Sequence, residues 1–153
     1  MSNNEQCIIM HSIQGLEQLL PAGCSLFFIG IGGVSMASLA EVLHGAGVSI
    51  SGSDWHESAT VTRLRSLGMQ VFTGPQKASN IEGASCVIRT AAAHNDNPEI
   101  QAARAAGIPI FERAQAWGVI MQAYKNAICV SGTHGKTSTT SMVTHILMEA
   151  QMD

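Results

Sequence analysis

Residues 27–36 read Phe27-Phe28-Ile29-Gly30-Ile31-Gly32-Gly33-Val34-Ser35-Met36, an apolar run that passes through closely spaced glycines into a helical pattern. Glycines at such a junction allow a tight turn and let a phosphate approach the backbone, while the start of the helix supplies free N–H donors. The third glycine of the dinucleotide fingerprint GxGxxG would fall on Ser35. The alternative is a glycine turn needed only for close packing of helix on strand. We predict a phosphate-binding loop formed by Gly30, Ile31, Gly32, Gly33, Val34 and Ser35.

Outward from this loop, short apolar runs alternate with helical patterns along nearly the whole chain. Strands are expected at 26–31, 48–51, 69–72, 86–90, 108–111 and 127–131. Helices are expected at 34–44, 60–67, 98–106, 113–124 and 136–149, with a weaker one at 12–20. This alternation is typical of βα units that build a parallel sheet covered on both faces. The sequence therefore predicts an α/β, Rossmann-like fold with a mostly parallel sheet.

The turn residues agree with these boundaries. Gly47, Gly68 and Gly107 each follow an expected helix and precede an expected strand, as helix-ending glycines do. Asn97 stands immediately before Pro98 at the start of another helix, which is the arrangement of an N-cap followed by proline in the first turn.

The composition limits the classes of function. The chain is 46% hydrophobic and 12% charged, which indicates a buried core. A net charge of −3 provides no basic surface, so no nucleic-acid partner is expected. The four cysteines lack the spacing of a metal site and are expected to be reduced. The first residues lack a basic leader, and no apolar run approaches the roughly 18 residues of a membrane span, so a cytoplasmic protein is expected.

Asp54 is expected near a ligand of the first loop, and His94 is the histidine whose position makes it a candidate for the same place. Asp54 ends the second expected strand, 21 residues after Gly33, where dinucleotide folds place an acid that bonds a ribose hydroxyl. His94 follows the fourth expected strand, at the sheet edge where ligands of open parallel sheets bind. An NAD-dependent oxidoreductase remains an alternative, disfavoured by Ser35 and by a second loop further along the chain.

That second loop gives a sharper signal. The apolar run 127–130 leads into Ser131-Gly132-Thr133-His134-Gly135-Lys136-Thr137-Ser138, a shortened P-loop in which Val130 replaces the usual first glycine. Backbone N–H groups of such a loop hold phosphates, Lys136 would neutralise them as the catalytic cation, and the Thr137 hydroxyl would bind Mg²⁺. The predicted ATP site comprises Gly132, Thr133, His134, Gly135, Lys136, Thr137 and Ser138.

The series of motifs, in its order, resembles the Mur ligase family, and within it the ligases that join L-alanine to UDP-N-acetylmuramic acid. The matching stretches run from about residue 25 to 147. They are the glycine loop 30–36, Ser51-Gly52-Ser53-Asp54, Asp96-Asn97-Pro98-Glu99-Ile100, Gly107-Ile108-Pro109-Ile110 and Gly132-Thr133-His134-Gly135-Lys136-Thr137.

The resemblance implies a division of the chain and a role for each part. Residues 1–125 would be a UDP-sugar-binding domain, and residues 126–153 the start of a central domain that binds ATP and Mg²⁺. Residues 30–35 would hold the diphosphate, with Asp54 and the stretch Thr90–Ala93 beside the nucleoside. The implied reaction phosphorylates the muramyl carboxylate, and the amine of L-alanine then attacks the acyl phosphate.

The chain departs from the family's pattern in two places. Gly74-Pro75 stands where the family usually has Gly-His, which removes one polar contact near the nucleotide. Arg89-Thr90-Ala91-Ala92 stands where the fourth strand usually ends in Ser-Ser-Ala, although Thr90 keeps a hydroxyl.

The chain stops soon after the second loop, so we expect it not to catalyse ligation alone. The apolar side of the helix at 136–149 would dock back on the first domain, pair with a second copy in a homodimer, or fray. The open alternatives are a free-standing nucleotide-sugar-binding or regulatory module and another Mur-type ligase, since the acceptor pocket that separates these ligases lies outside the chain.

Overall fold

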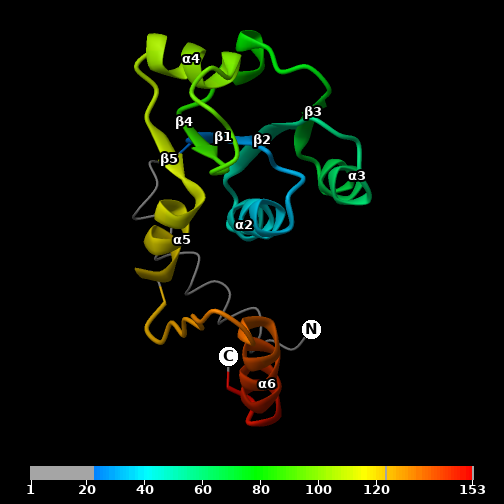
Figure 1. Cartoon of the computed structure of the whole chain (residues 1–153), viewed down its shortest axis with the longest axis vertical. Coiled ribbons are helices and arrows are strands. Elements are labelled where there is room, and N and C mark those ends of the chain that lie inside the picture. Colours follow the sequence, from blue (N-terminus) through cyan, green and yellow to red (C-terminus); the bar gives the residue numbers. More distant parts are fainter. Residues whose placement is uncertain (1–22, 123, 153) are drawn as a thin grey trace.

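The structure, a computed structural model, describes residues 23–122 and 124–152 and contains a parallel sheet of five strands (Figure 1). The strands are β1 (Ser25–Ile29), β2 (Ser49–Asp54), β3 (Gln70–Thr73), β4 (Cys86–Arg89) and β5 (Ile110–Glu112). Their order across the sheet is β3-β2-β1-β4-β5, and every neighbouring pair is parallel. The prediction of a Rossmann-like α/β fold is confirmed.

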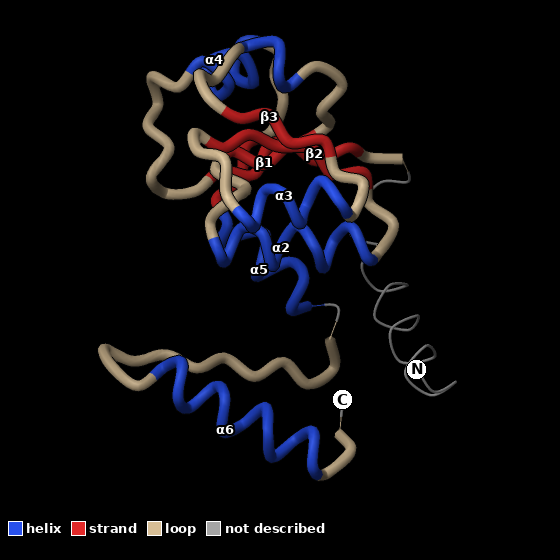
Figure 2. Tube along the Cα trace, turned by 90° about the vertical axis from the view of Figure 1, so that its right-hand side faces the viewer, coloured by secondary structure: helices blue, strands red, loops and turns tan. Residues whose placement is uncertain are grey.

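Helices cover both faces of this sheet. The helices of the described residues are α2 (Val34–Gly45), α3 (Ala59–Ser66), the short 3₁₀ helix η1 (Ala78–Ile81), α4 (Pro98–Ala105), α5 (Arg113–Gln122) and, apart from the sheet, α6 (Lys136–Glu149). Figure 2 shows α2, α3 and α5 on one side of the sheet and α4 on the other. Successive side chains of a strand point to opposite faces, so Phe28 joins the core under α2 and α3 while Phe27 joins the core under α4 and η1.

The helix boundaries expected from the turn residues are confirmed. Gly47, Gly68 and Gly107 have φ of +85°, +94° and +68°, a conformation in which glycine avoids the steric penalty of a side chain. The side chain of Asn97 accepts hydrogen bonds from the N–H groups of Glu99 and Ile100 and so caps α4. The weak helix expected at 12–20 lies outside the described residues.

The sixth strand, expected at 127–131, was a wrong prediction. These residues form no strand and pair with none of the five strands. An apolar run forms a stable strand only when a neighbouring strand satisfies its backbone N–H and C=O groups. Ile128 is accordingly 60% exposed.

The C-terminal helix α6 lies apart from the sheet in both views (Figures 1 and 2). None of its residues is buried, and Met142 and Ile146 are about two-thirds exposed, at 65% and 67%. The sequence left three outcomes for the apolar side of α6, and one of them was packing against the part of the chain that precedes it. The structure does not show that packing. No helix in the described part of the chain combines the length and the hydropathy that a membrane span requires.

Candidate nucleotide-binding site

The first glycine loop joins β1 to α2 and is held by the end of β2. The N–H groups of Gly30 and Ile31 both donate to the carbonyl oxygen of Ser53, at 2.8 and 3.0 Å. Gly30 has φ of +80°, and a Cβ there would lie 2.8 Å from Cγ2 of Thr90. Glycine is therefore favoured at this position both by the backbone conformation and by the close approach of the Thr90 side chain, which follows β4.

Asp54 fixes the middle of the same loop. Its Oδ2 accepts a hydrogen bond from the N–H of Gly32 at 2.8 Å, and its Oδ1 accepts one from the N–H of His56 at 3.1 Å. A Cβ on Gly32 would lie 2.8 Å from that Oδ2, so the carboxylate reaches the loop because glycine leaves room for it. A carboxylate has about four acceptor positions, so Asp54 keeps lone pairs for a ligand while it holds the loop.

A buried carboxylate braces the loop from the opposite face of the sheet, and sequence reasoning missed its role. Glu99 is 0% exposed; its Oε2 accepts from the hydroxyl of Ser53 at 2.7 Å and its Oε1 from the amide of Asn80 at 2.8 Å. Burial raises the pKa of Glu99, and these two hydrogen bonds oppose that rise. In the sequence this acid looks like an ordinary first-turn residue of α4, because nothing local indicates a partner 46 positions away.

The helix that follows the loop presents unused donors. Gly33 is the N-cap of α2, with extended backbone and no capping side chain, and the first turn of the helix carries no acid. Val34, the first residue of the helix, is 84% exposed. Free N–H groups at an exposed helix start attract anions, which fits the predicted phosphate-binding role.

A pocket of about 430 Å³ opens at the carboxyl ends of the central strands, next to this loop. It brings together Gly30, Asp54, Thr90 and His94, all of them singled out from the sequence. Its remaining lining consists of Ile29, Trp55, Gln76, Ala92, Ala93, Asp96, Asn97 and Pro98. The volume falls within the range of roughly 300–1,000 Å³ that is usual for small-molecule sites. The structure thus forms one concave site from residues of four separate segments.

One wall of the pocket is held by a residue that departs from the family's pattern. Arg89, at the end of β4, donates from Nη1 to the carbonyl oxygen of Ala93 at 3.3 Å and to Oδ1 of Asn95 at 3.2 Å. Its Nη2 forms an ion pair with Glu112 of β5 at 3.0 Å. The guanidinium therefore ties the segment that carries His94 to the strand end.

The second loop is held by its own lysine. Nζ of Lys136 donates to the carbonyl oxygens of Gly132 and Thr133, at 2.7 and 3.3 Å. Gly135, the N-cap of α6, has φ of +75° and no capping side chain, so the first N–H groups of α6 remain free as they do in α2. These features suit a phosphate, which would take over both the lysine and the free N–H groups.

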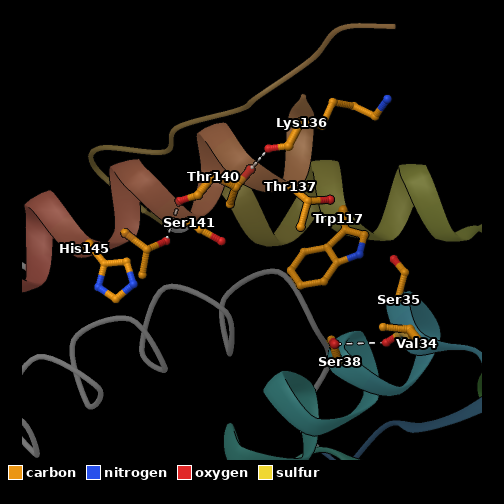
Figure 3. Close-up of a pocket in the computed structure, with 10 residues that line it drawn as sticks. Val34, Ser35, Ser38, Trp117, Lys136, Thr137, Thr140, Ser141 and His145 are labelled. Carbon is orange, nitrogen blue, oxygen red and sulfur yellow. Dashed lines mark hydrogen bonds between the residues drawn. The ribbon is translucent and has the colours of Figure 1, made fainter. Parts of the chain in front are cut away.

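The two loops lead into helices that face a second pocket, of about 680 Å³ (Figure 3). Figure 3 shows the indole of Trp117 from α5 between the start of α2, with Val34 and Ser35, and the start of α6, with Thr137. Within residues 23–122 and 124–152, no group of three or more His, Cys, Asp or Glu side chains is placed to hold a metal ion. Thr137 therefore remains the single metal ligand expected from the sequence.

Comparison with known proteins identifies the class. The model of the Mur ligase family, catalytic domain, matches residues 26–125, which is more than half of the chain. The chain belongs to the Mur ligase family.

Two relatives with high sequence identity are both named as UDP-N-acetylmuramate–L-alanine ligases. The chain is 54% identical to the UDP-N-acetylmuramate–L-alanine ligase of Lachnoclostridium phytofermentans over 82% of its own length, and 48% identical to that of Legionella pneumophila over 100%. It spans only 27% and 30% of those two proteins.

Solved structures agree with the sequence comparison. The UDP-N-acetylmuramate–alanine ligase of Thermotoga maritima superposes with a TM-score of 0.77 at 35% identity, over 83% of this chain and 30% of that one. The UDP-N-acetylmuramate:L-alanyl-γ-D-glutamyl-meso-diaminopimelate ligase of Neisseria meningitides gives the same TM-score at 30% identity, over 84% of this chain and 40% of that one. The fold is therefore shared by ligases with different acceptors.

Proposed function

We propose that the chain is the UDP-sugar-binding part of an ATP-dependent UDP-N-acetylmuramate–L-alanine ligase of peptidoglycan synthesis, acting in the cytoplasm. In this proposal residues 1–125 form the UDP-sugar domain and residues 126–153 begin the ATP-binding domain. The observation that carries it is the 48% identity to the Legionella pneumophila alanine ligase over all 153 residues, both loops included. The ligase with the longer peptide acceptor has the same fold but is only 30% identical, which favours alanine as the acceptor.

The geometry of the first site supports recognition of a nucleoside diphosphate-sugar. The loop at 30–35 offers free N–H groups at the start of α2 for the diphosphate, while Asp54 and Thr90 line the adjoining pocket for the nucleoside. Because Ser53, Asp54 and Thr90 already fix the backbone of the loop, the ligand would meet a site that needs little rearrangement.

The second loop fits ATP and Mg²⁺ in part. The free N–H groups of α6, Lys136 and the hydroxyl of Thr137 are suitable donors and ligands for phosphate and Mg²⁺, since Mg²⁺ is commonly held by one or two protein oxygens together with phosphate. ATP would supply the phosphoryl group that activates the muramyl carboxylate. Lys136 would then neutralise phosphate charge, and Thr137 would orient the metal.

Titration calorimetry of the 153-residue chain with UDP-N-acetylmuramic acid, UDP, ATP and NAD tests the proposal. We expect both uridine ligands to bind and NAD not to bind. Binding of NAD without binding of UDP would refute it. We also expect no release of ADP when the chain is supplied with ATP, UDP-N-acetylmuramic acid and L-alanine, and ADP release that depends on both other substrates would contradict that expectation.

A further inference from the structure

The first turn of α4 joins two connections that line the pocket to the end of a sheet strand. Two buried residues make this link, Asn97, which is the N-cap of α4, and Glu99; we call them the α4 anchor. We propose that Glu99 is a positioning residue for the ligand of the pocket, because the α4 anchor fixes the connections at 74–81 and 90–97 relative to the first glycine loop. The proposal rests on the proposed function, since it concerns the affinity of that same site.

The end of β2 is the fixed point of this arrangement. Ser53 pairs with Ile29 of β1 on one side and with Phe72 of β3 on the other, so neighbouring strands hold its backbone. Its carbonyl oxygen holds the first glycine loop. Its hydroxyl is buried and donates to Oε2 of Glu99 at 2.7 Å. One residue of the sheet is therefore bonded to the first glycine loop through its backbone and to the α4 anchor through its side chain.

The connection between β3 and β4 is bonded to the α4 anchor at two points. Near its start, Oε1 of Gln76 accepts a hydrogen bond from the side-chain amide of Asn97 at 2.6 Å. In η1, the side-chain amide of Asn80 donates to Oε1 of Glu99 at 2.8 Å. Gln76 lines the pocket, so the α4 anchor sets the position of this part of the pocket wall.

The connection between β4 and α4 ends at the α4 anchor. Residues 90–97 belong to no helix or strand, and His94 and Asn97 line the pocket. The N–H of Asn97 donates to the carbonyl oxygen of His94 at 3.2 Å, and Oδ1 of Asn97 accepts from the N–H of Glu99 at 2.8 Å. Arg89 holds the middle of this connection. The bond between Glu99 and Ser53 attaches its other end to the sheet.

This arrangement has a consequence for affinity. A site whose walls are already in place costs a ligand less ordering than one whose walls can shift. Without the bond from Glu99 to Ser53, the first turn of α4 and the two connections bonded to it could move relative to the end of β2. The ligand would then have to order that wall as it binds, and its affinity would fall.

Calorimetry with UDP on variants of the 153-residue chain tests the proposal. Ser53→Ala and Glu99→Ala should each weaken UDP binding by roughly 2- to 30-fold, the range over which such side-chain networks change the coupling between sites. The double variant should bind no more weakly than Glu99→Ala alone, because both changes break the same link. Glu99→Gln can keep both hydrogen bonds and should restore binding to within about two-fold of the unmodified chain. Ser53→Ala removes the smaller group and keeps the proposal testable if Glu99→Ala does not fold.

A control variant separates positioning from stability. Ile100→Val removes one methyl group from a fully buried side chain of the same helix and breaks none of the hydrogen bonds of the α4 anchor. It should destabilise the fold, as such truncations do, and bind UDP as the unmodified chain does.

Hydrogen exchange of backbone amides follows the pocket wall without a ligand. The N–H groups of Asn80 and Asn97 bond within the two connections, whereas that of Val87 bonds to Pro109 beside the sheet. In Glu99→Ala the exchange of Asn80 and Asn97 should accelerate more than that of Val87, because the wall loosens locally. In Ile100→Val the three rates should change only as far as the stability of the whole fold does.

The outcomes distinguish this proposal from the proposed function. If UDP binds the unmodified chain but Ser53→Ala and Glu99→Ala bind it equally well, or if Ile100→Val loses as much affinity as they do, the positioning proposal is wrong and the proposed function stands. If UDP does not bind the unmodified chain, the proposed function is wrong. Unchanged exchange of Asn80 and Asn97 in Glu99→Ala would refute the positioning role in either case.

Discussion

The side chain of Glu99 should affect the stability of the fold in two ways that can be measured separately, through its hydrogen bonds and through its charge. Replacing it with alanine removes the acceptor of the Ser53 hydroxyl, which is 1% exposed, and of the half-buried Asn80 amide. A buried polar group left without a partner costs about 1–3 kcal/mol. The loss of a partner for the buried Ser53 hydroxyl should lower the free energy of unfolding by this full amount, and the loss for the Asn80 amide should lower it by less. Removing a carboxylate that is shielded from water offsets part of this loss. We expect Glu99→Ala to lower the free energy of unfolding by about 2–4 kcal/mol.

Glu99→Gln should behave differently because a hydroxyl can both donate and accept. The new amide oxygen can accept from Asn80, and the Ser53 hydroxyl can rotate to accept from the new NH₂ group. Both contacts are then retained, so the loss at neutral pH should stay within about 1 kcal/mol. The two variants therefore separate the loss of hydrogen bonds from the loss of charge.

The pH dependence of the free energy of unfolding measures the second effect, that of the Glu99 charge. Since burial raises the pKa of Glu99 in the folded chain, the folded state binds this proton more tightly than the unfolded state. The contribution of Glu99 to stability is then full below the ordinary pKa of 4.5 and is lost as the pH rises through the folded pKa. Relative to Glu99→Gln, the unmodified chain should lose stability as the pH rises above 4.5.

Urea unfolding followed by circular dichroism from pH 4 to pH 8 measures both effects. A Glu99→Ala chain as stable as the unmodified one would show that the buried hydrogen bonds carry no net stability. An unchanged pH profile in Glu99→Gln would show that the carboxylate has an ordinary pKa, which would refute the electrostatic part of the reasoning.

Three further predictions concern other parts of the chain. Gly30→Ala should cost at least about 1–2 kcal/mol in urea unfolding and abolish UDP binding, because φ is +80° there, whereas Gly118→Ala, with open space around it inside α5, should be neutral or stabilising. Burial raises the pKa of Cys86 to about 11, so peptide mapping after alkylation at pH 8 should find the exposed Cys129 labelled well before it; equal rates would contradict this. Ile146→Gln should leave the melting temperature unchanged, since this side chain is 67% exposed, and it should convert any dimer seen by sedimentation to monomer if α6 forms the contact.

Most of the fold could be predicted because the relevant signals are local. Short apolar runs predicted all five strands of the sheet to within a few residues, and glycines with positive φ marked helix ends at Gly47, Gly68 and Gly107. The run at 127–131 has the same local signal and forms no strand, because pairing depends on a neighbour that local sequence does not reveal.

The loops of the candidate site could be predicted from the sequence, but the side-chain contacts that hold these loops in place could not. Gly30 and Asp54 could be chosen from their positions at strand ends and Thr90 from the resemblance to the Mur ligases, and the structure brings them to one pocket. The contact between Ser53 and Glu99 could not be chosen, since it joins residues on different elements across the sheet.

The two loops predicted to bind phosphate differ in the contacts that hold their backbone. The first is bonded to the end of β2 through the Ser53 carbonyl oxygen and Asp54, so its shape does not depend on a ligand. The second is bonded mainly to itself, through Lys136 and the carbonyl oxygens of Gly132 and Thr133. A phosphate arriving there must displace those contacts before it gains the lysine, and no strand supports the preceding residues. We therefore expect this chain to bind UDP more tightly than ATP, because only its first site is organised before the ligand arrives.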